Sequence, residues 1–383
     1  MLIKNATVYT MEDGNVLENT DILLEDGKIK EIGKNLTSGD DKVIDATGMY
    51  VTPGLIDAHI HTGGFDMKSQ DLNEMTDPVT SHVDAINSID INSRDFKELH
   101  KHGVTACCFI PGSANVICGT GFVGKTAGKS SVYELAVLNP AAMKCAMGGN
   151  PKGVYGKKGK EPMTRMGIAS IFRETLRKTR DYMEKKAKAG DDKEKIPAYD
   201  AKLEALIPVL NREIPLKVHS EQFDMLTVIN IAKEFGCDYT IEHGWACDLY
   251  ADELVKGGGD ICFGPVGIPE GYGELTGGDV ALVKELDDRG LNISLITDGP
   301  IYGPQILLIQ AGDAVRYGID HYRALRMITI NPARCLRVAD RIGSLAPGKD
   351  ADLVIWSAVP ALDMSARPVC TIIDGTVQCE EAE

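Results

Sequence analysis

The eleven residues from Val51 to His61 read Val-Thr-Pro-Gly-Leu-Ile-Asp-Ala-His-Ile-His. An apolar strand precedes the two histidines. Residues two apart in a strand point to the same face, so His59 and His61 are expected to project together. Paired imidazoles at a strand end are typical metal ligands, but His-x-His alone is a common pattern. The positions of the other histidines therefore decide its meaning.

Two more of the eight histidines close segments that are expected to be strands. His219 and His243 each end a short apolar run, and Asp298 ends a third run directly before a Gly-Pro turn. The carboxyl ends of parallel strands meet at one edge of the sheet, which is where barrel enzymes have their active sites. The remaining histidines lie in helical or loop stretches and are expected to have surface or packing roles; these are His82, His100, His102 and His321.

The predicted secondary structure differs between the two ends of the chain and its middle. Residues 1 to about 50 form short strand-like runs around an Asp-Gly turn, and similar runs return after residue 350. Between them, short apolar runs alternate with helical stretches, a pattern that favours an α/β fold with a parallel sheet. A length of 383 residues suits one large barrel with a small domain appended. We expect the two termini to pair into that small domain.

Composition narrows the function classes. A formal charge of −15 and a pI near 5.1 argue against binding to nucleic acid or to an anionic membrane, so a small-molecule partner is favoured. The start of the chain has no charged leader and apolar run, which predicts a cytoplasmic protein. Ten cysteines are scattered without a Cys-x-x-Cys pair, so reduced and mostly buried thiols are expected and a zinc ribbon is excluded.

With these features and two further motifs, the chain resembles the amidohydrolase superfamily over essentially its whole length. The motifs are Asn-Pro-Ala at 331–333 and Gly-Ser-Leu-Ala-Pro-Gly-Lys-Asp-Ala-Asp-Leu-Val at 343–354. Within the superfamily it looks most similar to the imidazolonepropionase-like and prolidase-like branch. The resemblance implies a (β/α)8 TIM-like barrel over residues 52–345, a small β-sandwich domain built from residues 1–51 and 346–383, and a homo-oligomer.

The resemblance also implies a metal site. His59, His61, His219 and Asp298 would bind a divalent transition metal, and His243 would bind a second metal or a water. Zinc is the first expectation, with iron, manganese or nickel as alternatives, in one or two ions per chain. Lys144 lies roughly where binuclear relatives carry a bridging carboxylated lysine, although an exposed lysine at a strand end explains it equally well.

The implied reaction is hydrolysis of a C–N bond in an amide, a cyclic amide or a dipeptide-like compound by a metal-activated hydroxide. Asp298 would take the proton of the nucleophile and pass it to the leaving nitrogen. The chain has His-Ser-Glu at 219–221 where many similar proteins have His-Ala-His, so Glu221 could act as an acid or bind a substrate amine.

Two alternatives remain open at this point. A deaminase acting on a heterocycle is the first, but deaminase relatives place a glutamate three residues after the histidine, where this chain has Gln222. A catalytically idle binding or assembly protein of the same fold is the second, and the intact set of five ligand residues weighs against it.

Two glycine-rich segments attract attention. Residues 119–126 match the P-loop pattern literally, but the following Ala-Gly-Lys-Ser-Ser at 127–131 is a poor first turn of a helix. We therefore expect a glycine-rich loop at the catalytic edge instead of a nucleotide site.

The second segment runs from Gly148 to Gly167 and is long and basic, as lids and binding loops often are. Asn150, Lys152, Tyr155 and Arg165 are its candidate substrate-binding residues, and the cations among them suggest an anionic substrate.

Overall fold

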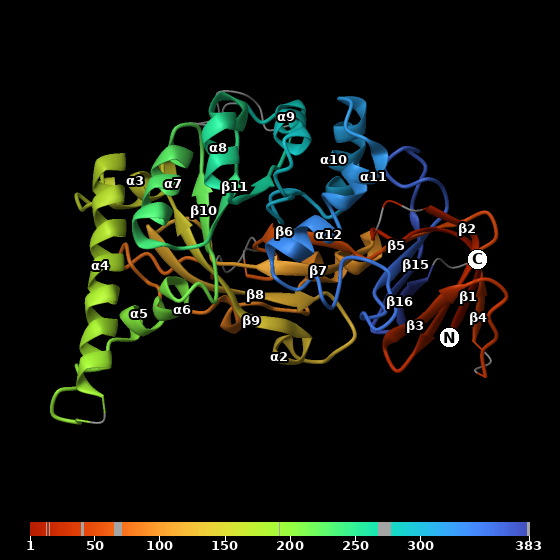
Figure 1. Ribbon diagram of the computed structural model, residues 1–383, viewed down its shortest axis with the longest axis horizontal. Helices are drawn as coiled ribbons and strands as arrows, with labels where there is room; N and C mark the ends of the chain where they lie inside the picture. The colour runs from red at the N-terminus through yellow and green to blue at the C-terminus, as the bar shows by residue number, and fades with distance from the viewer. Residues whose placement is uncertain are drawn as a thin grey trace.

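The structure is a computed structural model, and it describes residues 1–380 apart from 13, 15, 40–41, 65–70, 191 and 267–276. Two eight-stranded sheets organise it. Figure 1 shows them side by side, with both termini in the smaller unit. The sheet from the middle of the chain has the order β13-β12-β11-β10-β9-β8-β7-β6. Its strands are β6 (Leu55–Ile60), β7 (Val104–Phe109), β8 (Ile117–Lys125), β9 (Ala136–Ala146), β10 (Leu216–Ser220), β11 (Tyr239–His243), β12 (Asp260–Phe263) and β13 (Ile293–Leu295).

This sheet, from β6 to β13, curls into a nearly closed barrel, which confirms the predicted fold class. Its first and last strands lie next to each other. Just beyond them, the amide of His61 donates to the carbonyl of Gly299, and Thr297 donates its hydroxyl to Asp57 at 2.6 Å. These contacts join the start of the barrel to its end, so the motif at 51–61 and the loop with Asp298 lie together.

Strand β8 departs from the parallel pattern, because it runs antiparallel to both β7 and β9 while the other neighbouring pairs are parallel. The expectation of a glycine-rich loop at the catalytic edge for residues 119–126 is therefore wrong, because residues 119–125 lie in β8. A Cβ on Gly119 would lie 2.6 Å from the carbonyl oxygen of Val83, and one on Gly121 would lie 2.4 Å from Cγ2 of Ile110. These glycines serve close packing of the strand.

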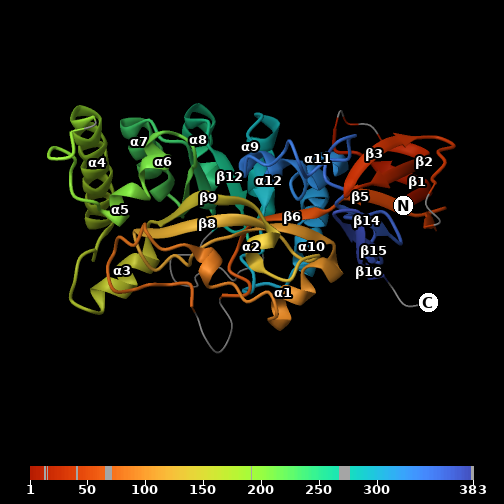
Figure 2. The ribbon, with the colours of Figure 1, turned by 90° about the horizontal axis from the view of Figure 1, so that it is seen from below.

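Helices cover the outside of the barrel (Figure 2). The longest, α4, begins after Thr164, whose side chain caps the amide of Gly167, and it buries Ile168, Phe172 and Leu176 at four-residue spacing on one face. The helices are α1 (Arg94–Glu98), α2 (Val132–Leu135), α3 (Gly149–Gly156), α4 (Arg165–Ala189), α5 (Ala201–Glu204), α6 (Ile207–Leu210), α7 (Asp224–Phe235), α8 (Ala251–Gly257), α9 (Val283–Asp288), α10 (Gln305–Arg316), α11 (His321–Arg326) and α12 (Ile330–Cys335).

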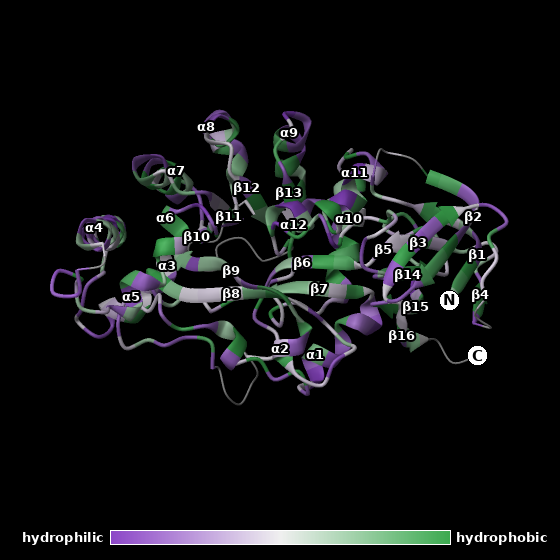
Figure 3. Ribbon diagram, turned by 60° about the horizontal axis from the view of Figure 1, so that its bottom comes forward, coloured by the Kyte–Doolittle hydropathy of each residue, from purple (hydrophilic) through white to green (hydrophobic). Residues whose placement is uncertain are grey.

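The second sheet combines the two ends of the chain. Its order is β16-β15-β14-β5-β1-β2-β3, and β4 pairs with β1. The strands are β1 (Leu2–Tyr9), β2 (Val16–Glu25), β3 (Lys28–Gly33), β4 (Val43–Asp45), β5 (Tyr50–Pro53), β14 (Leu353–Trp356), β15 (Pro368–Ile373) and β16 (Thr376–Glu380). The antiparallel pair β5–β14 joins the N-terminal and C-terminal parts, and the sheet has its own apolar cluster. Figure 3 shows apolar residues along the strands of both sheets.

A buried lysine connects the two units. Lys125, at the end of β8, lies 2.9 Å from Asp350 and 3.1 Å from Asp352, and it also pairs with Asp374. Its ammonium is therefore already neutralised inside the protein. Lys125 also ends a strand and does not begin a helix, and the two facts together exclude a P-loop at 119–126. The ten cysteines are free thiols, nine of them buried, as predicted. Among the described residues, none of the helices combines the length and the apolar character needed to cross a membrane.

Candidate metal centre

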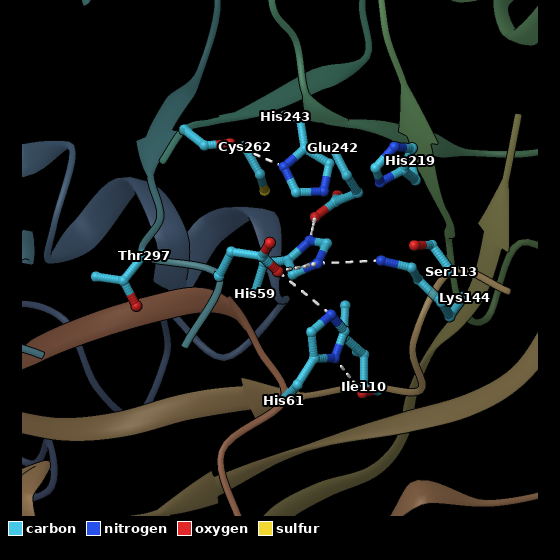
Figure 4. Close-up of polar contacts among 12 residues, drawn as sticks. His59, His61, Ile110, Ser113, Lys144, His219, Glu242, His243, Cys262 and Thr297 are labelled. Carbon is cyan, nitrogen blue, oxygen red and sulfur yellow. Dashed lines mark hydrogen bonds and ion pairs between the residues drawn. The ribbon is translucent and has the colours of Figure 1, made fainter. Parts of the chain in front are cut away.

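The residues predicted to bind metal converge at the carboxyl edge of the barrel (Figure 4). His59 lies near the end of β6, His219 in β10 and His243 at the end of β11, while Asp298 follows β13. His243 and Asp298 have φ angles of 71° and 55°, a left-handed conformation that costs a non-glycine residue of the order of 1–3 kcal/mol. The strained backbone thus occurs at two residues of the cluster.

Asp298 lies among the imidazoles. Its Oδ1 is 3.3 Å from Nε2 of His61 and 3.5 Å from Nε2 of His59. The ring of His243 is centred 4.9 Å from that of His59 and 4.3 Å from that of His219. Ligand atoms of His59, His243 and Asp298 all lie within 4.8 Å of one another, a spacing that one ion could bridge.

Three of the imidazoles have their second nitrogen occupied by the protein. Nδ1 of His61 faces the carbonyl of Ile110 at 2.9 Å, and Nδ1 of His243 faces that of Gly264 at 2.8 Å. Nδ1 of His59 faces a carboxylate oxygen of Glu242 at 2.5 Å. Metal-binding histidines usually donate their other N–H in this way, which leaves Nε2 as the ligand atom.

His219 is turned the other way. Its Nε2 lies 2.9 Å from Oε1 of Glu221, and its Nδ1 is buried with no hydrogen-bond partner among the described residues. Such an atom is uncommon in folded proteins, and here it belongs to a residue that the sequence predicts as a ligand. Oδ1 of Asp298 is also buried, and it faces the imidazoles of His61 and His59. The residues present thus fit a divalent ion.

The local electrostatics favour the ligating forms of these side chains. Burial lowers the pKa of His59 and of His243 well below the ordinary value, so both rings are neutral at pH 7. Burial opposes ionisation of Asp298, but a hydrogen bond from His61 and the nearby His243 and Lys144 outweigh it and lower the pKa of the carboxyl to about 2. Neutral imidazoles beside a carboxylate form a typical transition-metal ligand set.

Lys144 lies on β9 and is fully buried, so the interpretation as an exposed lysine is wrong. Its Nζ is 3.0 Å from Nε2 of His59, and burial lowers its pKa. A lysine next to the histidines and with a lowered pKa is more readily uncharged than a surface lysine. Figure 4 shows its side chain pointing toward the histidines.

The segment after Gly148 differs from the expected loop, because residues 149–156 form α3. Tyr155 is buried there and donates its hydroxyl to Oδ1 of Asn115 at 2.5 Å, so its hydroxyl is engaged within the protein, and its contact with substrate stays a prediction. Asn150 donates to Ser113 at 2.7 Å. Lys152, on the same helix, is partly exposed.

Arg165 begins α4. Its Nε donates to Asp224 at 2.7 Å, and its guanidinium lies 4.7 Å from the centre of the Phe223 ring. A guanidinium held by a carboxylate and an aromatic ring has less to offer a substrate carboxylate than a guanidinium without such partners.

Sequence reasoning missed several buried residues around the cluster. Glu242 contacts His59, Lys217 contacts Glu242, and Asp57 accepts hydrogen bonds from Thr297. Trp245 lies against His243, with their rings 4.9 Å apart. Glu242 and Lys217 are charged residues within otherwise apolar strands, a signal that could have indicated a buried pair.

Comparison with known proteins points to one family. Two models described as "Amidohydrolase family" match residues 214–377 and 42–89. A solved amidohydrolase from Thermotoga maritima is 36% identical, with 99% of this chain and 100% of that chain covered and a TM-score of 0.92.

Two curated relatives are longer than this chain. The amidohydrolase tasK of Hapsidospora irregularis is 28% identical over 99% of this chain, which spans only 43% of that relative. A dihydroorotase of Lactobacillus helveticus is 55% identical over 60 residues, 16% of this chain and 13% of the relative.

Proposed function

Because this chain belongs to the amidohydrolase family, as its likeness to the Thermotoga maritima protein shows, we propose that it hydrolyses a C–N bond with the help of a divalent transition metal. The bond would lie in an amide, a cyclic amide or a dipeptide-like compound. One observation carries the proposal: His59, His61 and His243 each have Nδ1 against a protein acceptor, so that Nε2 is the nitrogen of each ring that would bind an ion near Asp298.

The residues that would hold the ion are His59, His61, His219, His243 and Asp298. Imidazoles together with a carboxylate suit zinc first, while iron, manganese and nickel accept the same ligands. Lys144 lies beside His59, where it would serve as a carboxylated bridge if two ions bind. When bound, a divalent ion supplies a water of lowered pKa and polarises the scissile carbonyl.

Asp298 is the proposed acid and base. Its carboxyl is ionised at neutral pH, so it would accept a proton from the attacking water. The same carboxyl then returns that proton to the leaving nitrogen. His243 is the residue proposed to stabilise charge that develops on the substrate.

Two buried polar atoms near the histidines suggest how a substrate would be held. Oε2 of Glu221 and Nε1 of Trp245 have no hydrogen-bond partner in the described part of the chain. Glu221 would accept from an amine or amide N–H of the substrate, and Trp245 would donate to a substrate oxygen.

The proposed substrate is a small polar molecule, and Lys152 and Arg165 are the residues proposed to favour an anionic one. Equal KM values for the neutral and the carboxylate form of one substrate would contradict that last point. We further propose a homo-oligomer, which light scattering tests.

Elemental analysis by plasma mass spectrometry tests the proposal. The purified protein should contain one or two equivalents of transition metal, and the double variant His59→Ala/His61→Ala should contain none. His82→Ala is the matched control, because His82 is exposed and outside the cluster, and it should keep the metal. No metal in the wild-type protein, even after reconstitution, would contradict a metal-dependent mechanism and favour a binding role.

A panel of cyclic amides, N-acyl amino acids, dipeptides and aminated heterocycles tests the bond. Ring opening or release of an amino acid supports the proposal. Release of ammonia from a heterocycle would identify a deaminase instead.

A further inference from the structure

A carboxylate and a lysine lie side by side in the interior of the barrel, behind His59. Glu242 on β11 and Lys217 on β10 are each fully buried, and Nζ of Lys217 lies 2.8 Å from Oε1 of Glu242. Nζ of Lys217 also lies 3.4 Å from Sγ of Cys262, which is buried too. A charged pair in such surroundings is costly to bury, so its contacts deserve an explanation.

Both oxygens of Glu242 are occupied. Oε2 accepts from Nδ1 of His59 at 2.5 Å, while Oε1 accepts from Lys217 and from the hydroxyl of Thr240. Figure 4 shows the carboxylate directed at the His59 ring. Two donors on one oxygen prevent the carboxylate from rotating, so Oε2 is held toward His59.

This arrangement determines which nitrogen of His59 carries the proton. An ionised carboxylate only accepts hydrogen bonds, so Nδ1 of His59 must donate and Nε2 must keep its lone pair. Nε2 faces Lys144 at 3.0 Å and Asp298 at 3.5 Å, on the side where the ion would bind. Without an acceptor at Nδ1, the ring is free to adopt the other tautomer, in which Nε2 carries a hydrogen and cannot bind a metal.

We infer that Glu242, fixed by Lys217 and Thr240, is the positioning residue that holds His59 in the metal-binding tautomer. This inference rests on the proposed function, because it takes Nε2 of His59 as a ligand. Glu242 does not touch the reacting atoms, and a buried pair of apolar side chains of similar size would satisfy the packing equally well. The pair is therefore explained by its effect on His59.

Two double variants separate positioning from packing. Lys217→Met with Glu242→Gln removes both charges but leaves an amide oxygen that can turn toward Nδ1 of His59. Lys217→Met with Glu242→Met also removes both charges and leaves no acceptor. Neither variant contains an uncompensated buried charge, so both are expected to fold, and guanidinium unfolding of the metal-free proteins checks this.

Zn²⁺ is titrated into each metal-free protein in competition with a chelator. The Kd of the Glu242→Met double variant should rise by roughly 10- to 100-fold over that of the wild type, the usual effect of losing an outer hydrogen-bond partner of a metal ligand. The Kd of the Glu242→Gln double variant should stay close to the wild-type value. Equal Kd values in the two variants, whether both normal or both weakened, would overturn the inference.

Nitrogen-15 NMR of the metal-free proteins supplies a readout that needs no metal. His59 should show a protonated Nδ1 and an unprotonated Nε2 in the wild type and in the Glu242→Gln double variant, and a mixture of tautomers in the Glu242→Met double variant. The same mixture in the wild type would overturn the inference. A wild-type protein with the expected tautomer but no affinity for Zn²⁺ would contradict the proposed function and leave the role of Glu242 in the ring's tautomer intact.

Discussion

Replacing Lys125 by methionine should destabilise the junction between the two sheets. Lys125 pairs with three carboxylates, of which Asp350 and Asp352 are almost fully buried. Asp350 keeps two other cations, Lys28 at 2.5 Å and Arg341 at 2.9 Å. The described part of the chain offers Asp352 no other cation.

The expected cost follows from that difference. Removing one partner of a buried pair typically costs about 3–5 kcal/mol, and a single uncompensated carboxylate places this variant near 3 kcal/mol. Guanidinium unfolding measures it, with Lys129→Met as the control, because Lys129 is exposed on the loop after β8. Adding Asp352→Asn to Lys125→Met should recover most of the loss.

The loss should also depend on pH. Burial raises the pKa of Asp352 to about 6 even with Lys125 in place. For a carboxyl whose pKa is higher in the folded protein, the contribution to stability is present at acid pH and is lost as the pH rises through the folded pKa. Lys125→Met raises this pKa further, so its cost should be largest above pH 7 and smaller near pH 5. A cost below about 1 kcal/mol at pH 8, typical of a surface ion pair, would refute the reasoning.

Three other substitutions give distinct expectations. Gly121→Ala should cost about 1–3 kcal/mol in guanidinium unfolding, because its Cβ would clash inside the sheet, whereas Gly153→Ala on α3 has nothing within 4 Å and should be neutral or slightly stabilising. Equal effects would contradict the packing role of the β8 glycine. Tyr155→Phe should cost about 1–3 kcal/mol by leaving Oδ1 of Asn115 without its donor but should not change KM, and a raised KM would support a substrate-binding role for Tyr155. Asp298→Asn should lower kcat by at least about 10²-fold, and an unchanged kcat would exclude its role as acid and base.

Much of the cluster was predictable because strand geometry restricts where side chains can point. His59 and His61 lie two apart at the end of one strand, and His219 and His243 close others, so a parallel sheet brings them to one edge. Asp298 closes a further run and reaches the same edge, and the amidohydrolase resemblance added Lys144 to the set. The imidazolonepropionase-like and prolidase-like branch stays a prediction.

Other features depend on contacts that no local pattern reveals. Gly119 and Gly121 looked like a loop because glycine is unfavourable in strands, yet close approach by Val83 and Ile110 requires it there. Tyr155 lies in a segment whose glycines favour a loop, yet residues 149–156 form a helix that buries its ring. The pairing of Glu242 with His59 joins residues 183 positions apart, which a single sequence does not show.

The central claim is that a metal held by the strand-end histidines drives hydrolysis of a C–N bond. The most direct test titrates Zn²⁺ into the metal-free protein and follows hydrolysis of the best substrate of the panel at each addition. The rate should rise in proportion to added metal and level off at one or two equivalents, and the His59→Ala/His61→Ala protein should stay inactive throughout. A metal-free protein that already turns over at the full rate, or a double variant that recovers activity with Zn²⁺, would contradict the claim.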